Sequence, residues 1–185
     1  QILLYKGLWC YFTGLALYYE YYQTLEEVRS SSDVLEIGKA IRCYYDICEK
    51  MWSEYYPILE KSNNYKDLNL YRNEVSETYS KFAMSENSKR QELHSLQNQI
   101  KENSKTLLRQ IEKGFYAEAL KFLKLSGDLA SIRLQRHDEI AAYYYQGIVL
   151  MTVMLSNPSA ESKEYLERLI DLISDIESES AASVY

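Results

Sequence analysis

The side chains that could carry chemistry are few and widely spaced. Two histidines, His94 and His137, lie far apart in the sequence, and neither is close to a cysteine. Cys43 and Cys48 are five positions apart, which on a helix places them on different faces. A metal site or an activated nucleophile needs several such groups at one point. We therefore expect both histidines on helix surfaces and the cysteines as buried structural residues.

Composition narrows the function classes further. The six glycines are scattered, so no phosphate-binding loop is present in the sequence. The net charge is −6 with no basic run, which argues against nucleic acid as the main partner. Three sparse cysteines are typical of reduced thiols in an intracellular, cytoplasmic protein. We predict a protein that is not an enzyme and that carries no cofactor and no metal.

Tyrosines and one acidic stripe are the candidates for partner binding. Runs such as YYEYY (18–22) and AYYYQ (142–146) place adjacent rings on different helix faces, so they cannot all point into one core. Carboxylates near the end of the chain follow a helical stripe, which is either a solvated face or a docking surface for a basic or amphipathic segment. The predicted partner-binding residues are Tyr18, Tyr22, Tyr143, Tyr144, Glu164, Glu167 and Asp171.

Hydrophobic periodicity predicts an all-α protein. Only two prolines and six glycines occur, and no stretch alternates with a period of two. We expect a single helical domain over residues 1–185, cut from a longer protein, with a break near 85–92 and a frayed end at 178–185. Pro57 should kink or end the second helix, and 61–67 should form a loop. Helices are predicted over 2–28, 34–60, 67–87, 88–112, 115–126, 137–155 and 159–177.

Two of these segments have an unusual apolar pattern. Residues 2–22 contain only Lys6 and Glu20 as charged residues, roughly the length that crosses a bilayer. The internal Lys6, the dispersed tyrosines and the lack of a flanking basic cluster favour a buried central helix over a membrane span. Residues 88–112 are instead polar with sparse apolar positions, which predicts a helix exposed on most of its surface.

One stretch has the spacing of a known helical repeat. In KGFYAEALKFLK (113–124), Gly114, Tyr116, Glu118, Ala119 and Leu120 are spaced as in the turn and second helix of a tetratricopeptide repeat, which this stretch resembles. The resemblance implies antiparallel hairpins in which small residues such as Ala119 permit close helix contact. Gly14 and Gly147 are expected at such contacts in first helices. The implied hairpins pair 2–28 with 34–60, 98–112 with 115–126, and 137–155 with 159–177; an irregular helical bundle is the alternative.

A second resemblance covers residues 1–87. A tyrosine-rich helix is followed by IGKAIRCYYDICEKM and then by YKDLNLYRNEVSETYSKFAMSENS. This order is similar to the Bro-type (Alix-like) domain. The resemblance implies a tetratricopeptide-like core and a role as an adaptor in endosomal sorting.

Together these patterns predict a non-enzymatic interaction module or scaffold that docks a partner helix or peptide in a helical groove. Within the same class, a Bro-type adaptor for a helical tail of a sorting protein, or modules similar to microtubule-interacting-and-trafficking domains, are alternatives. A different alternative is an architectural subunit that forms a bundle or coiled coil with a partner chain through residues 88–112. The expected partner is a protein, and the oligomeric state stays open.

Overall fold

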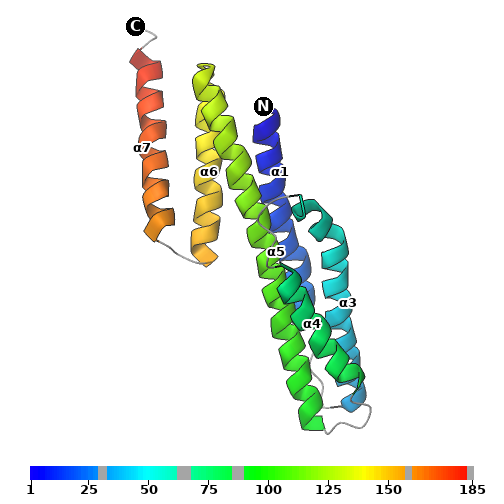
Figure 1. The fold of residues 1–185 in the computed structure, drawn as a ribbon. Helices are drawn as coiled ribbons and strands as arrows, with labels where there is room; N and C mark the ends of the chain where they lie inside the picture. The colour runs from blue at the N-terminus through cyan, green and yellow to red at the C-terminus, as the bar shows by residue number, and fades with distance from the viewer. Residues whose placement is uncertain (29–32, 62–67, 85–89, 157–159, 183–185) are drawn as a thin grey trace. The chain divides into compact units, whose positions relative to one another are not determined.

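The computed structural model describes residues 1–28, 33–61, 68–84, 90–156 and 160–182. Within these ranges the chain is helical and has no strand, which confirms the all-α prediction. Figure 1 shows the elements in chain order. They are α1 (Ile2–Leu17), the π-helical turn η1 (Tyr18–Tyr22), α2 (Gln23–Glu27), α3 (Val34–Leu59), α4 (Leu68–Ala83), α5 (Arg90–Ile132), α6 (Arg136–Ser156) and α7 (Ala160–Ala182).

Several predicted boundaries agree with the structure. The first predicted helix is one continuous helical path through α1, η1 and α2. Helix α3 begins after Asp33, whose Oδ1 accepts a hydrogen bond from the Leu35 backbone N–H at 3.2 Å. Pro57 lies in the last turn of α3. The expected loop at 61–67 and the expected break at 85–92 fall mostly outside the described residues, and α7 continues as a helix to Ala182.

The hairpin predicted between 98–112 and 115–126 is wrong. Both segments belong to α5, a single helix of 43 residues that passes through Gly114 without a turn. A Cβ at Gly114 would lie 3.0 Å from Leu59 Cδ1, so this glycine permits close packing. A glycine costs a helix interior about 1 kcal/mol relative to alanine, and tertiary packing readily offsets that amount.

Contacts divide the chain into two compact units, where the sequence predicted one domain. Unit 1 comprises Gln1–Thr13 with Phe115–Tyr185, and unit 2 comprises Gly14–Gly114. Helices α1 and α5 each contribute residues to both units. Each unit is described below by itself.

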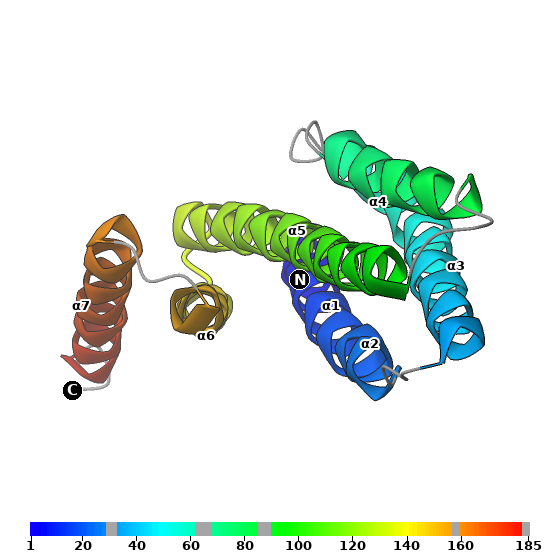
Figure 2. The ribbon, with the colours of Figure 1, turned by 90° about the horizontal axis from the view of Figure 1, so that it is seen from below.

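Unit 2 packs α3 against its neighbours through a dense core. Helices α3 and α4 lie side by side (Figure 2), with the rings of Tyr45 and Tyr79 stacked at 4.0 Å. The Tyr44 hydroxyl donates to the Val28 carbonyl at 3.1 Å, which ties α3 to the end of α2. The part of α5 expected to be exposed is anchored here instead, because its regular apolar positions are buried: Leu93, Leu96, Ile100, Leu107 and Ile111.

Unit 1 contains the predicted hairpin of α6 and α7, which lie side by side in Figures 1 and 2. Their shared core consists of Tyr143, Leu150, Leu169 and Ile176. Gly147 lies at this contact, since a Cβ there would meet Leu166 Cδ1 at 3.4 Å. Helix α1 approaches α5 closely at Gly7, where a Cβ would lie 2.7 Å from Leu123 Cγ and 3.2 Å from the Ala119 carbonyl oxygen. Ala119 is thus at a close helix contact, as predicted, but its partner is α1.

Candidate docking surface on unit 1

The reactive side chains do not assemble into a chemical site. All three cysteines are free. Burial raises the pKa of the Cys10 thiol to about 11, with a smaller contribution from Glu118, and burial raises that of Cys48 to about 12. Thiols with such pKa values are poor nucleophiles near neutral pH. Among the described residues, no group of three or more histidine, cysteine or acidic side chains could hold a metal ion.

The outer side of α1 carries a row of exposed, large apolar side chains. Ile2, Tyr5, Trp9 and Phe12 follow one another at intervals of three, four and three residues. Their exposed fractions are 74%, 64%, 52% and 56%. An interval pattern of three and four is that of the a and d positions in a heptad repeat. We call these four residues the α1 stripe.

The opposite side of α1 is held firmly within unit 1. Besides the close contact at Gly7, the Tyr11 hydroxyl and Thr152 Oγ1 of α6 share a hydrogen bond at 3.1 Å. Trp9 of the stripe is itself only half exposed, because its ring also meets the buried Phe115 ring edge to face, with centroids 6.2 Å apart. These contacts join α1 to α5 and α6 within unit 1 and leave the α1 stripe exposed. The sequence predicted a buried central helix; the structure buries one apolar side of α1 and leaves the other side exposed.

Helix α6 carries a second exposed row. Tyr144, Ile148, Met151 and Leu155 are spaced by four, three and four residues, and we call them the α6 stripe. Tyr144 is 58% and Leu155 is 90% exposed, while Ile148 is half-buried. No charged residue occurs in α6 after Glu139. Since Tyr11 and Thr152 are bonded, the neighbouring stripe residues Phe12 and Met151 come from adjoining parts of the two helices.

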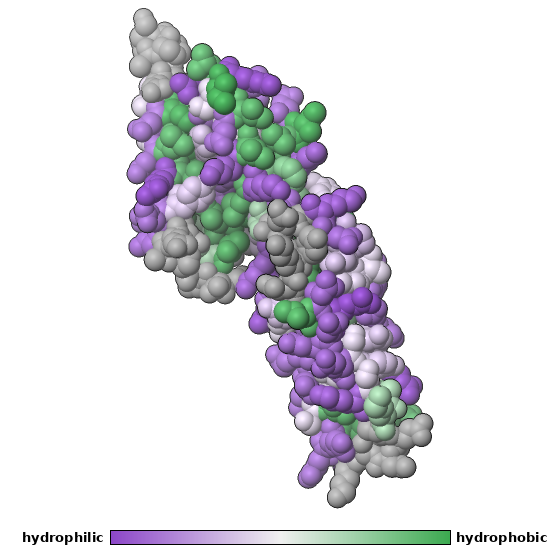
Figure 3. Space-filling model, in the orientation of Figure 1, coloured by the Kyte–Doolittle hydropathy of each residue, from purple (hydrophilic) through white to green (hydrophobic). Residues whose placement is uncertain are grey.

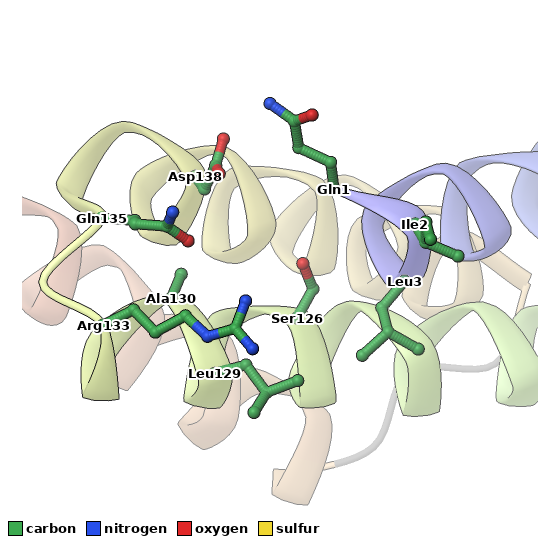
Figure 4. A pocket seen from close by; sticks show the side chains of 9 residues that line it. All are labelled: Gln1, Ile2, Leu3, Ser126, Leu129, Ala130, Arg133, Gln135 and Asp138. Carbon is green, nitrogen blue, oxygen red and sulfur yellow. The ribbon is translucent and has the colours of Figure 1, made fainter.

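The end of the α1 stripe borders a hollow. A cavity of about 520 Å³ is lined by Ile2 together with residues at the end of α5 and the start of α6. Figure 4 shows Arg133 extending along the floor of this cavity beside Leu129. On the face drawn in Figure 3, hydrophobic residues also reach the surface at the C-terminal end of α5, where Leu129 and Ile132 are exposed.

The predicted partner-binding tyrosines fall into different environments. Tyr144 is exposed on the α6 stripe. Tyr143 is only 8% exposed, and a Cβ at Gly127 would lie 2.7 Å from its ring, so Tyr143 is a core residue and its selection as a surface residue is wrong. Tyr18 and Tyr22 belong to unit 2, where their rings stack with centroids 4.9 Å apart.

The predicted acidic residues lie on the exposed surface of α7. Glu164 pairs with Arg168 and Glu167 with Lys163, each one turn away on the same helix. Asp171 is exposed beside them. Exposed pairs of this kind contribute at most a few tenths of a kcal/mol each, about 0.3–0.5. This surface has the properties of a solvated helix face.

Sequence reasoning missed the α1 stripe. Its signal was present, because the interval of three and four residues from Ile2 to Phe12 can be read from the sequence. The signal was hidden by the apolar residues on the other side of the same helix, among them Leu4, Cys10 and Tyr11. Only the positions of α5 and α6 distinguish the covered side from the exposed one.

Comparison of the chain with protein-family models, curated proteins and solved structures gives no match. The helical, hairpin-like packing is compatible with a helical-repeat fold, but neither the tetratricopeptide-like nor the Bro-type resemblance is supported by a family match. Of the helices that the structure describes, none is long and apolar enough to span a membrane.

Proposed function

We propose that this protein is a non-enzymatic interaction module that docks a partner helix along the α1 stripe. The observation that carries this proposal is the set of four large apolar side chains at heptad spacing, each more than half exposed on a helix whose other side is buried. Such a row complements the apolar seam of a second helix. Tryptophan and tyrosine, both in the stripe, are also the residue types enriched at the energetic centres of protein interfaces.

The free energy available from burying the α1 stripe indicates how strongly a partner helix should bind. Fully burying a large apolar side chain gives about 1.5–3 kcal/mol, and the stripe residues still have roughly half to three quarters of that to gain. Together they offer roughly 3–8 kcal/mol, against an association cost of about 4–15 kcal/mol. One helix on the α1 stripe alone should therefore bind weakly and reversibly. Tighter binding requires that the partner also covers the α6 stripe.

Finer assignments belong to this proposal as well. The tetratricopeptide-like resemblance favours a scaffold that presents a helical groove, and the Bro-type resemblance would make the partner a helical tail of a sorting protein. Either role suits an intracellular, cytoplasmic adaptor in protein transport. The alternative of an architectural subunit is less well supported, because residues 88–112 contribute their apolar side chains to the core of unit 2.

The test uses a designed probe helix and the two tryptophans of the chain. Trp52→Phe leaves Trp9 as the single tryptophan, so its fluorescence reports on the stripe. The probe is a two-heptad peptide with leucine at the a and d positions and with alanine and glutamine elsewhere. We expect a saturable blue shift of Trp9 fluorescence. A peptide of the same composition with scrambled leucine positions should cause no shift.

Matched variants localise the binding. Tyr5→Ser and Phe12→Ser should each weaken binding of the probe peptide, measured by calorimetry. Leu70→Ser is the control, because Leu70 is a similarly exposed apolar residue, 61%, on α4 in unit 2. The proposal fails if no peptide binds, if the scrambled peptide binds equally well, or if Leu70→Ser weakens binding as much as the stripe variants do.

A further inference from the structure

The charged residue beside the α1 stripe indicates which charge the docking helix should carry. This inference rests on the proposed function. Lys6 is exposed and is the sole charged residue of α1. It lies in the sequence between Tyr5 and Trp9, at a position that flanks the heptad seam. No charged residue follows Phe12 in the rest of α1.

Lys6 shares an aromatic ring with a second lysine. Its Nζ lies 5.7 Å from the centroid of the Phe122 ring, and Lys121 Nζ lies 5.9 Å from the same centroid. Lys121 has an acidic neighbour, Glu118, at 3.6 Å. Lys6 makes no ion pair with any residue that the structure describes. Two ammonium groups at one ring repel each other, and among the described residues only Lys121 has an acidic partner.

We infer that the partner is an amphipathic helix that places an Asp or Glu beside its apolar seam, opposite Lys6. Flanking charges of this kind select partners and set register in helix pairs. The acidic residue should lie opposite the part of the stripe between Tyr5 and Trp9, because Lys6 is the only charged residue of α1.

Two other occupants fit the charges less well. A second copy of α1 cannot neutralise Lys6, because α1 contains no acidic residue. An anionic lipid surface is usually met by a helix with a broad apolar face and several basic residues along its edges. The α1 stripe is narrow, its helix carries a single lysine, and the other side of that helix is buried.

The experiment compares three probe peptides that differ only at the flanking position. Each is the two-heptad leucine peptide, with Glu, Gln or Lys beside the seam. We expect affinity in the order Glu, Gln, Lys, with a ratio of roughly threefold to tenfold between the first and the last at low salt. The preference should shrink at high salt, because exposed charges are screened.

Variants assign the preference to one side chain. Lys6→Glu should reverse the order of the three peptides, and Lys6→Gln should remove the preference while the Gln peptide still binds. Lys81→Glu on α4 in unit 2 changes the net charge by the same amount and should leave the order unchanged. Circular dichroism checks that each variant keeps its helical content.

The possible outcomes separate this inference from the proposed function. Binding of all three peptides with equal affinity, or a Lys81→Glu effect equal to that of Lys6→Glu, would overturn the inference and leave the docking function standing. Absence of binding by every peptide would overturn both.

Binding to phosphatidylcholine–phosphatidylserine vesicles without peptide binding would assign the face to a lipid surface. Self-association that the peptides compete away, seen by sedimentation, would assign it to a second copy; either result contradicts the acidic helix.

Discussion

The two units use their charged residues differently. In unit 2, ion pairs join separate helices: Glu26 of α2 pairs with Lys105 at 2.5 Å and Lys101 at 3.5 Å, both on α5. Arg72 of α4 makes a two-pronged pair with Glu49 of α3, at 2.9 and 3.2 Å, and its guanidinium lies 4.8 Å from the Trp52 ring centroid. The charges of unit 2 therefore stabilise its own helix packing.

Unit 1 has the opposite arrangement. Its ion pairs between Lys121 and Glu118 and between Arg136 and Glu139 each join residues of one helix. Its large apolar side chains, in contrast, remain exposed at heptad spacing along α1 and α6. In Figure 3 the visible surface of unit 2 is drawn mostly hydrophilic or intermediate, whereas unit 1 shows distinct hydrophobic patches. Unit 2 also exposes large apolar side chains, such as Leu35, Leu70 and Met84, but its ion pairs join its own helices. On the proposed function, unit 1 instead offers its exposed apolar rows to another chain.

The largest expected effects test whether each unit has a core of its own. Leu123→Ala in unit 1 and Leu25→Ala in unit 2 both truncate fully buried side chains, and each should cost about 2–5 kcal/mol. Trp9 lies in unit 1 and Trp52 in unit 2, so Trp52→Phe and Trp9→Phe backgrounds report on one unit each. In urea unfolding, Leu123→Ala should lower the Trp9 midpoint more than that of Trp52, and Leu25→Ala should do the reverse.

The single-tryptophan backgrounds without the leucine substitutions serve as controls for that experiment. If both midpoints moved together by the same amount in every variant, the chain would unfold as one cooperative body. The distinction between the units would then describe contacts and not stability.

Next in size is the effect of adding one methyl group at two helical glycines of unit 1. A Cβ at Gly7 would lie 2.7 Å from the buried Leu123 and close to the Ala119 carbonyl, so Gly7→Ala should destabilise by roughly 1–3 kcal/mol. At Gly147 the nearest atom is 3.4 Å away, an ordinary contact. Gly147→Ala should therefore stabilise by about 0.5–1 kcal/mol through helix preference. Thermal unfolding distinguishes the two, and a stabilised Gly7→Ala variant would show that α1 is not closely packed on α5.

The glycines also show which parts of the fold could be predicted from the sequence and which could not. Periodicity was sufficient for the helices and for the hairpin of α6 and α7, because both depend on local pattern and on the breaker at Asn157 and Pro158. It failed at Gly114, since a missing Cβ serves equally well in a tight turn and in a close helix contact. The deciding neighbour is Leu59, which is far away in the sequence.

The same limit applies to the candidate site. Tyr143 and Tyr144 are adjacent and chemically identical, yet one is buried against Gly127 and the other is exposed. Residue type could indicate that some tyrosines face outward, but not which ones. Which tyrosine is buried depends on where α5 and α7 pack against α6. The local sequence of α6 does not contain that information.

A smaller effect is expected from the charges that join the helices of unit 2. The hydrogen bond from Lys105, with help from Lys101, lowers the pKa of Glu26. A lowered pKa in the folded state means that the pair stabilises above the unfolded value of about 4.3 and is lost as pH falls through the folded value. Glu26→Gln should therefore lower the Trp52 urea midpoint at pH 7, and the difference from the parent should disappear in acid.

The control for Glu26 is an ion pair that joins no helices. Glu36 pairs with Lys39 at 2.8 Å within α3, and both side chains are exposed. Glu36→Gln should move the Trp52 midpoint less than Glu26→Gln does at pH 7. Equal shifts would contradict the view that unit 2 uses its charges to connect helices.

The smallest stability effect belongs to the surface that we expect to matter most for binding. Tyr144→Ser on the α6 stripe removes an exposed ring and should change stability by no more than about 0.5 kcal/mol. Tyr143→Ser, one residue away, removes a buried ring and should cost about 3 kcal/mol or more. Binding should rank these variants the other way: a longer peptide that spans both stripes should lose affinity with Tyr144→Ser. If Tyr144→Ser destabilised the chain as much as Tyr143→Ser, the α6 stripe would be part of the fold's own packing, and unit 1 would resemble unit 2 in completing itself.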